Sequence, residues 1–450
     1  MTNEKNEKYG LIGKTLVHSY SKEIHEALGR YQYQLFSLAE DEMPDFINAR
    51  DFRGLNVTIP YKKDVIPLCD EVTDLARGIG AVNTLFWKNA SGTGASESIN
   101  QEDKILVGHN TDYEGFLYAA SRAGIDFEGK GVLILGTGGT SLMARRAASD
   151  QNAAKIYIAS RHPKTDPPSG SEIQNAGILS TVSYDQLPEI ADSIDVIVNT
   201  TPVGTFPNNM QQVIRLKDFP GCQAVIDVIY NPFKTALLLE AEKLGLKYTN
   251  GLPMLVAQAT AAAGYFLGTP GAFQKENQRI IKAMKQQMGN IILIGMPGTG
   301  KSIIGKLLAE LTGKTLQDTD AKIEEEAKMT IPEIFEKEGE AGFRDREAAI
   351  CKKLGKERNL IIATGGGAIL RPENVDALRQ NGTLVHITRS IDKLPTRGRP
   401  LSKNIETLKK MEAQRLPLYK AAADITFRNN YTCSRKKLRQ RVNTYILEKL

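Results

Sequence analysis

Three short apolar segments of the chain run directly into glycines, and this arrangement restricts the fold more than any other feature. They are GVLILGTGG (131–139), IILIGMPGTGKS (291–302) and LIIATGGG (360–367). Continuous Val, Ile and Leu runs are typical of parallel strands buried on both faces, and a glycine loop after such a strand commonly binds a ligand. Helix-like stretches at 141–149 and 302–311 follow two of these segments. The sequence therefore predicts α/β layers throughout.

The length of 450 residues allows about three folded units. We expect residues 1–110 to form a first α/β unit, with a polar hairpin tip at 89–103, and residues 111–251 to form a Rossmann-type unit. Alanine-rich helices at about 252–285 are expected to pack back on the first unit. A third α/β unit with a central parallel sheet is expected at 290–450, after a short polar join at 286–289.

The composition excludes several classes of protein. The 58 basic and 52 acidic residues leave a net charge of +6, and this small excess indicates no nucleic-acid partner. No apolar run approaches the roughly 20 residues that span a bilayer, and the opening MTNEKNEKYG lacks the apolar core of a signal peptide. The four cysteines lie far apart without a CxxC pair, which argues against a zinc ribbon or disulfide framework. We expect a soluble cytoplasmic protein without nucleic-acid or membrane partners; the sequence does not indicate an oligomer.

The second glycine segment matches the phosphate-binding loop G-x-x-x-x-G-K-[ST], placed between a strand and a helix. Glycines let backbone N–H groups turn toward phosphate oxygens, and the helix N-terminus adds partial positive charge. Lys301 is expected to reach the outer phosphates, and the Ser302 hydroxyl to ligate Mg²⁺. The predicted ATP site comprises Gly298, Thr299, Gly300, Lys301, Ser302 and Ile303.

Charged residues follow this loop in an order that suits phosphoryl transfer to an anionic substrate. Asp318 and Asp320 lie one residue apart at a predicted strand end, so both are expected to face the same side. One carboxylate can hold hydrated Mg²⁺ while the other accepts a substrate hydroxyl proton. Arg344, Arg399 and Arg415 can form forks for carboxylate and phosphate.

This ordered set resembles shikimate kinase over essentially all of 290–450. The resemblance implies a shikimate site with both arginines on the substrate carboxylate, made of Asp320, Arg344, Gly366 and Arg415. It also implies that Asp318 helps to position Mg²⁺, that Asp320 is the catalytic base, and that Arg399 is a lid arginine over ATP. Ile303 stands where the family usually has Thr, and the stretch 388–415 is several residues shorter than usual. A shorter lid excludes water less well, so turnover is the quantity that we expect it to affect.

The first glycine segment is typical of a dinucleotide-binding loop. Its residues are Gly136, Thr137, Gly138 and Gly139. An NAD-specific site has an acidic residue about 20 positions on, at the end of the second strand. Here KIYIAS (155–160) ends in Ser160 and is followed by Arg161 and Lys164, a cationic pair that suits a 2′-phosphate. NADP(H) is therefore predicted in preference to NAD.

Short polar motifs in the first unit gain meaning from their order. They are Ser19-Tyr-Ser21, Asn56-Val-Thr58-Ile-Pro60-Tyr-Lys62, Gly80-Ala-Val-Asn83 and Asn110-Thr-Asp112. Taken alone each is unspecific, because Lys62 could be solvated and Asn110-Thr-Asp112 could cap a helix. With the dinucleotide loop and two later segments, Asp227-Val-Ile-Tyr230-Asn-Pro and Gly251-Leu-Pro-Met-Leu-Val-Ala-Gln258, they resemble shikimate dehydrogenase across about residues 8–275.

The second resemblance implies hydride transfer between NADPH and the C3 carbonyl of 3-dehydroshikimate. Lys62 would exchange the hydroxyl proton beside Asp112, which orients it. The implied substrate contacts are Ser19 and Ser21 on the carboxylate, with Thr58, Asn83, Tyr230 and Gln258 on the hydroxyls. The implied nicotinamide contacts are Asp74, Val228, Gly251 and Met254. Residues 1–110 would be the substrate-binding domain and 111–251 the NADP domain.

The two resemblances support one another, because the product of the first reaction is the substrate of the second. The main interpretation is a bifunctional enzyme of aromatic amino-acid biosynthesis. One alternative is a sensor that keeps a shikimate-binding fold without turnover, although Lys62, Asp112, Lys301, Ser302 and Asp320 are all present. Another alternative is oxidation of quinate with NAD, against which Arg161 and Lys164 argue.

Overall fold

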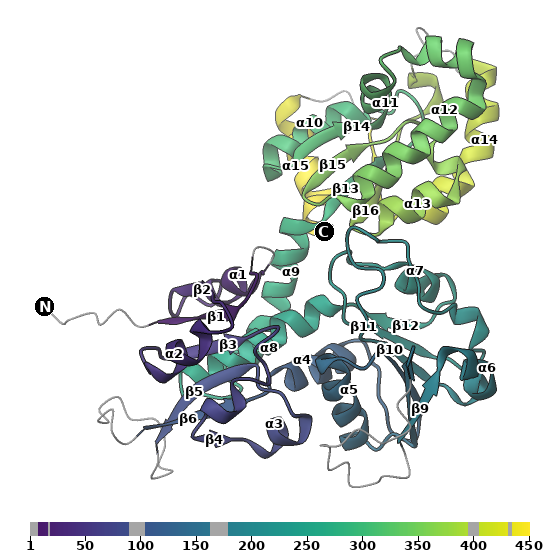
Figure 1. Ribbon diagram of the computed structural model, residues 1–450. Coiled ribbons are helices and arrows are strands. Elements are labelled where there is room, and N and C mark those ends of the chain that lie inside the picture. The colour runs from purple at the N-terminus through teal and green to yellow at the C-terminus, as the bar shows by residue number, and fades with distance from the viewer. Residues whose placement is uncertain (1–7, 17–18, 90–103, 163–178, 395–404, 431–433) are drawn as a thin grey trace, which may run out of the picture. The chain divides into compact units, whose positions relative to one another are not determined.

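The computed structural model describes residues 8–16, 19–89, 104–162, 179–394, 405–430 and 434–450. The chain forms two compact units, both of them α/β as the sequence predicts (Figure 1). The first comprises Met1–Thr205, Gln211–Phe233 and Leu237–Lys282; the second comprises Phe206–Met210, Lys234–Ala236 and Ala283–Leu450. Within the described ranges, no helix combines the length and the apolarity that crossing a membrane requires.

The first unit opens with a mixed six-stranded sheet in the order β2-β1-β3-β5-β6-β4. The strands are β1 (Tyr9–Gly13), β2 (Tyr33–Ser37), β3 (Gly54–Val57), β4 (Glu71–Val72), β5 (Thr84–Asn89) and β6 (Lys104–His109). Helices α1 (Ser21–Glu26), α2 (Glu42–Asn48) and α3 (Asp74–Ile79) belong to the same part of the chain. Strands β5 and β6 pair antiparallel from Thr84 opposite His109 to Asn89 opposite Lys104. Both sides of the predicted hairpin are therefore present, while its tip at 90–103 lies outside the described residues.

The second sheet of this unit is parallel, in the order β12-β11-β10-β7-β8-β9. Its strands are β7 (Gly131–Leu135), β8 (Lys155–Ser160), β9 (Leu179–Ser183), β10 (Val196–Asn199), β11 (Ala224–Asp227) and β12 (Lys247–Thr249). Helices α4 (Asp112–Arg122), α5 (Gly139–Asp150), α6 (Leu187–Ile190) and α7 (Ala236–Lys243) accompany it. Val132 and Ile134 of β7 join one hydrophobic cluster and Leu133 and Leu135 join another. This alternation explains why the first glycine segment is apolar at every position, since β7 is buried on both faces.

Helix α8 (Gly251–Phe266) links the two sheets of the first unit. It packs along α4 and also contacts α1, β3 and β5. A side chain at Gly115 of α4 would lie 2.6 Å from the Met254 carbonyl oxygen, so glycine permits the close approach of the helices. Helix α9 (Asn277–Met288) follows, and only Gly289 separates it from the next strand. The polar join expected at 286–289 is therefore mostly helical.

The second unit is built on a parallel sheet in the order β14-β15-β13-β16-β17. Its strands are β13 (Asn290–Ile294), β14 (Thr315–Asp318), β15 (Leu360–Ala363), β16 (Gly382–Thr388) and β17 (Ile425–Arg428). Its helices are α10 (Lys301–Thr312), α11 (Thr319–Ala327), α12 (Ile331–Lys356), α13 (Pro372–Arg379), α14 (Ile405–Ala422) and α15 (Arg435–Tyr445). The second and third glycine segments leave the neighbouring strands β13 and β15 at their carboxyl ends. Both loops therefore reach the same edge of the sheet, where open α/β folds bind ligands.

Candidate active sites

The first unit contains a cavity of about 400 Å³ lined by residues of its first sheet, by α8 and by residues that follow β11. It brings together most of the predicted substrate and nicotinamide residues. These are Ser19, Ser21, Thr58, Lys62, Asn83, Asp112, Val228, Tyr230, Gly251, Met254 and Gln258. Thr15, Tyr20, Asn56 and Thr140 line the same cavity, and sequence reasoning gave them no role. Asp74 is exposed as the first residue of α3 and is not part of this lining.

An ion pair stands in this cavity between residues 50 positions apart. The Lys62 Nζ donates to Asp112 Oδ2 at 2.6 Å, and the two side chains are 25% and 17% exposed. Lys62 follows a turn after β3 in which Tyr61 N–H donates to the Thr58 carbonyl. Asp112 is the first residue of α4, and Thr111 at the N-cap makes no side-chain capping bond. The carboxylate thus orients the Lys62 amino group, which can give a proton to a substrate oxygen as the ammonium form or take one from it as the neutral amine.

Hydroxyl groups cluster at the start of α1. The Ser19 hydroxyl donates to Ser21 Oγ at 3.1 Å and accepts from Ser21 N–H at 3.2 Å. A small group of hydroxyls beside a helix N-terminus can donate to a carboxylate. In the same cavity, Gln258 Nε2 donates to the Leu255 carbonyl at 3.0 Å, which fixes the direction of that amide.

The dinucleotide loop turns sharply at Gly136, whose φ is +103°, and Gly138 is the N-cap of α5. A side chain added at Gly138 or Gly139 would meet nothing within 4 Å, so the backbone there is open to a ligand at a helix N-terminus. Ser160 ends β8, and Arg161 beyond it is exposed. The predicted partner of Arg161, Lys164, lies outside the described residues. None of these nucleotide-loop residues lines the substrate cavity, but Thr140 directly after the loop does.

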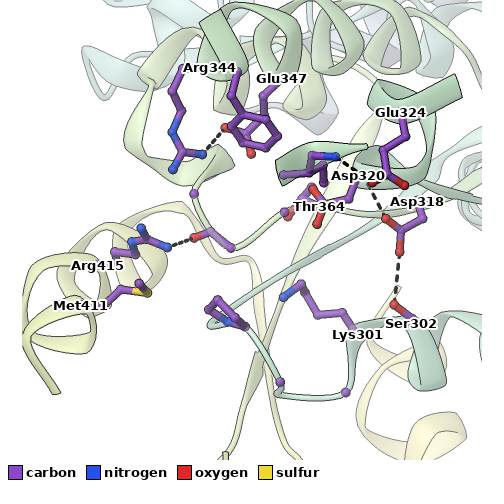
Figure 2. A pocket seen from close by; sticks show the side chains of 18 of the residues that line it. Lys301, Ser302, Asp318, Asp320, Glu324, Arg344, Glu347, Thr364, Met411 and Arg415 are labelled. Atoms are coloured by element: carbon purple, nitrogen blue, oxygen red, sulfur yellow. Dashed lines mark hydrogen bonds and ion pairs between the residues drawn. The ribbon is translucent and has the colours of Figure 1, made fainter. Parts of the chain in front are cut away.

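The second unit contains a cavity of about 660 Å³ at the carboxyl ends of its strands (Figure 2). Its lining includes most of the predicted ATP, metal and substrate residues. These are Gly298, Gly300, Lys301, Ser302, Ile303, Asp318, Asp320, Arg344, Gly366 and Arg415. Thr299 is instead buried, and its hydroxyl donates to the Met296 carbonyl. Arg399 lies outside the described residues.

The phosphate-binding loop has the backbone that its glycines predict. Gly295, Gly298 and Gly300 have φ values of +143°, +87° and +96°, a region that disfavours other residues. Lys301 Nζ donates to the carbonyl of Gly295 at 2.8 Å, across its own loop. Asn429, after β17, donates from Nδ2 to the Thr299 carbonyl at 2.8 Å and so ties the loop to the edge of the sheet.

Both aspartates line the cavity, but they do not both lie on the predicted strand. Asp318 ends β14, but the chain then turns into α11, so Asp320 lies in the first helical turn rather than on a strand. Asp318 caps this helix by accepting the Asp320 N–H at 3.1 Å, and also accepts the Ser302 hydroxyl at 3.2 Å (Figure 2). Burial, together with the charges of Asp318 and Glu347, raises the pKa of Asp320 to about 6.

Glu347 is a buried site residue to which sequence reasoning gave no role. It is 1% exposed and accepts from Arg344 at 2.7 Å, three positions earlier on α12. Burial raises its pKa, although Arg344 opposes the shift. Glu347 Oε1 and Asp320 Oδ1 are both buried, and neither accepts a hydrogen bond from the described residues. The signal was the i, i+3 spacing of Arg344 and Glu347, which places both on one helix face.

The third glycine segment passes between these charged groups. A side chain at Gly365 would lie 2.7 Å from Asp320 Oδ1 and 2.8 Å from Glu347 Oε1, and one at Gly367 would collide with the Arg344 guanidinium. The carbonyl of Gly366 accepts from Arg415 at 2.8 Å and from the Tyr419 hydroxyl at 2.6 Å. The glycines therefore bring the backbone close to a cavity lined by carboxylates and arginines from several elements.

Two protein families match separate parts of the chain. The family model described as shikimate dehydrogenase substrate binding domain matches residues 11–85, and the shikimate kinase model matches residues 297–450. A curated shikimate dehydrogenase (NADP(+)) from Clostridium perfringens (strain SM101 / Type A) is 34% identical over 262 residues, which is 56% of this chain and 90% of the relative.

Solved structures give the same picture for the first unit. A chorismate mutase/shikimate 5-dehydrogenase fusion protein from Clostridium acetobutylicum is 31% identical with a TM-score of 0.53, and the match covers 62% of this chain and 98% of that one. A quinate dehydrogenase from Corynebacterium glutamicum, solved with NAD, is 27% identical with a TM-score of 0.51 over 62% of this chain and 98% of the other.

Proposed function

We propose that this chain, which belongs to the shikimate dehydrogenase family and carries a shikimate kinase domain at residues 297–450, catalyses two successive reactions. The first unit would reduce 3-dehydroshikimate to shikimate with NADPH. The second would transfer phosphate from ATP to shikimate, giving shikimate 3-phosphate. The proposal rests on one observation: each of two cavities in a single chain holds the acid–base and anion-binding groups that its own reaction needs.

In the first reaction, bound NADPH supplies the hydride. Lys62 gives a proton to the C3 oxygen of the substrate, and Asp112 keeps the ammonium group directed into the cavity. Ser19 and Ser21 hold the substrate carboxylate through their hydroxyls. Thr58, Asn83, Tyr230 and Gln258 contact the ring oxygens.

The cofactor assignment rests on the open backbone at Gly138 and Gly139 and on the charge beyond β8. A pyrophosphate can accept hydrogen bonds at the N-terminus of α5. Arg161, with Lys164, is proposed to hold the 2′-phosphate of NADP(H). Asp74, the first residue of α3, is proposed to lie on the nicotinamide side of the bound nucleotide.

In the second reaction, the loop before α10 holds the ATP phosphates with its backbone N–H groups and Lys301. The donor set fits Mg²⁺: Ser302 and Asp318 supply a hydroxyl and a carboxylate, and Mg²⁺ is usually completed by phosphate oxygens and water. Asp320 accepts the proton of the substrate hydroxyl, while Arg344 and Arg415 hold its carboxylate.

A single sequential assay tests both halves. We expect NADPH absorbance to fall when 3-dehydroshikimate is added, and shikimate 3-phosphate to form when ATP and Mg²⁺ follow. NADPH loss without phosphorylated product would mean that the short stretch between 388 and 415 has cost the kinase its turnover. No change in either step would support a binding protein without catalysis.

A second assay, run in the direction of oxidation, separates the proposal from quinate oxidation. A dehydrogenase solved with NAD shares this fold, so quinate with NAD is run beside shikimate with NADP⁺. Arg161 predicts faster turnover with shikimate and NADP⁺, because NAD offers no 2′-phosphate to a cation. Faster turnover with quinate and NAD would overturn the assignment of substrate and cofactor.

A further inference from the structure

A cluster of buried polar side chains surrounds Asn83 at the dehydrogenase cavity, and three of its members have no part in the mechanism above. Asn56 lies within β3, Thr84 begins β5, and Thr111 precedes α4. They are 4%, 0% and 0% exposed, and Asn83 between them is 3% exposed. Buried polar groups are retained at a cost in desolvation unless they are fully hydrogen-bonded, so their bonding pattern is informative.

The side chain of Asn83 has only one orientation compatible with its neighbours. The Thr111 backbone N–H lies 2.7 Å from Asn83 Oδ1. A backbone N–H can only donate, so the atom that faces it must be the amide oxygen and not the nitrogen. The Thr84 hydroxyl donates to the same oxygen at 2.9 Å, and the Thr111 hydroxyl lies 3.2 Å from it. The two lone pairs of this oxygen are therefore fully used inside the protein.

The hydrogen bonds that reach Asn83 run in one direction. The Tyr33 hydroxyl donates to Asn56 Oδ1 at 2.7 Å, and Asn56 Nδ2 donates to Thr84 Oγ1 at 3.3 Å. Thr84 in turn donates to Asn83. The chain of donors begins in the core, where Tyr33 is stacked on His25 with a centroid distance of 4.0 Å. Linked hydrogen bonds of this kind polarise one another and hold every member in a single rotamer.

The nitrogen of Asn83 is left for the substrate. Among the described residues none accepts from Asn83 Nδ2, and this atom is not one of the buried side-chain atoms that lack a partner. Since Asn83 lines the cavity, its nitrogen is open to it. The hydrogen bond from the Thr111 N–H also holds Asn83 next to the residue before Asp112. The position of the amide is therefore fixed relative to the Lys62–Asp112 pair.

We propose that Thr84 and Thr111 are positioning residues that make Asn83 a donor-only contact, so that this part of the cavity selects a substrate oxygen with a free lone pair. The proposal rests on the dehydrogenase function and adds to it a specificity rule. A hydroxyl or carbonyl oxygen is accepted beside Asn83, whereas an ammonium group at the same ring position is rejected because it can only donate.

A double-mutant cycle tests this role. Thr84→Val keeps the shape of the side chain and removes the donor to Asn83, while Thr84→Ser restores a hydroxyl. We expect Thr84→Val to lower kcat/KM for 3-dehydroshikimate by about fivefold to tenfold, the effect of about one hydrogen bond, and Thr84→Ser to recover most of it. In an Asn83→Ala background, Thr84→Val is expected to add less than about twofold, because its effect passes through the amide.

Thr260→Val is the matched control. Thr260 is 1% exposed, its hydroxyl donates to Asn277 Oδ1 at 2.6 Å, and it does not line the cavity. We expect it to lower Tm as Thr84→Val does while leaving kcat/KM unchanged. An equal cost of Thr84→Val with and without Asn83, or an equal loss in Thr260→Val, would overturn the proposal. An inert wild-type chain would instead overturn the dehydrogenase function and this proposal with it, so wild-type turnover is measured first.

Discussion

The two cavities of this chain differ in the charged groups that surround the residue proposed to transfer a proton. In the dehydrogenase cavity a cation and an anion face each other, with Lys62 and Asp112 at 2.6 Å. In the kinase cavity four carboxylates contribute to the lining, those of Asp318, Asp320, Glu324 and Glu347, and the pKa of Asp320 rises to about 6. Asp112 orients the Lys62 amino group through a direct hydrogen bond, whereas the raised pKa of Asp320 among like charges makes its carboxylate readier to take a proton. The difference shows that proton transfer can be prepared either by pairing charges or by crowding them.

The largest expected effect on activity comes from replacing Asp320, the proposed base of the kinase reaction. Asp320→Asn cannot accept the proton of the substrate hydroxyl, so we expect kinase kcat to fall on the order of 10³- to 10⁴-fold. Dehydrogenase kcat in the same preparation is expected to stay unchanged. Asp345→Asn is the control, since the Asp345 side chain is 73% exposed and pairs with Arg371. Kinase activity above about a tenth of wild type would contradict the role of Asp320 as base.

A smaller effect is expected from the paired lysine. Lys62→Met removes the proton donor, but the side chain is 25% exposed, so water can supply a proton in its place. We expect dehydrogenase kcat to fall about 10²-fold, with the KM for NADPH unchanged. Steady-state rates with 3-dehydroshikimate measure this, and Lys63→Met at the neighbouring exposed position serves as control. If both lysine variants lost equal activity, the pair with Asp112 would not be the proton donor.

Removing charge outside both cavities is expected to matter less. Arg161→Ala takes away an exposed cation, so we expect the KM for NADPH to rise about tenfold, near the value of one charge-assisted hydrogen bond. The KM for NADH is expected to stay the same, which makes NADH the internal control. A parallel rise for both cofactors would place Arg161 away from the 2′-phosphate.

The smallest expected effect is the dependence of the kinase reaction on pH. Because the pKa of Asp320 is raised to about 6, this carboxyl is ionised above pH 6 and protonated below it. Only the ionised form accepts a proton, so we expect kinase kcat/KM to be flat at higher pH and to fall about tenfold per unit below about pH 6. Rates at saturating ATP between pH 5 and 8 measure this. A profile that stays flat to pH 5 would show that burial does not raise the Asp320 pKa in the enzyme.

Much of the fold was predictable from local pattern. The apolar runs before the glycines became β7, β13 and β15, because a strand covered on both faces must be apolar at every position. The loop at 295–302 was equally clear, since its glycines are needed for positive φ at Gly295, Gly298 and Gly300. The need for apolar residues in a buried strand and for glycine at positive φ concerns residues that are adjacent in the chain, so a local sequence pattern reveals it.

Other features depend on residues that meet only after folding. The sequence predicted both Asp318 and Asp320 at a strand end. In the structure Asp318 caps α11 by accepting the Asp320 N–H, so Asp320 lies in the first turn of that helix. The sequence indicated that the glycines at 365–367 form a ligand-binding loop, but only the structure shows that Gly365 and Gly367 leave room for Asp320, Glu347 and Arg344 from other elements.

The sequence by itself therefore determined the α/β class, the nucleotide loops and the identity of the chemical groups. Only the tertiary structure decided which charged groups form ion pairs, which carboxylates lie close together, and which side chains are fixed by hydrogen bonds. It set Lys62 against Asp112 across 50 residues, buried Glu347 beside Asp320, and saturated the oxygen of Asn83 with donors from Thr84 and Thr111. The physical reason is that burial and hydrogen-bond geometry depend on distances between elements, and no local pattern of residues specifies them.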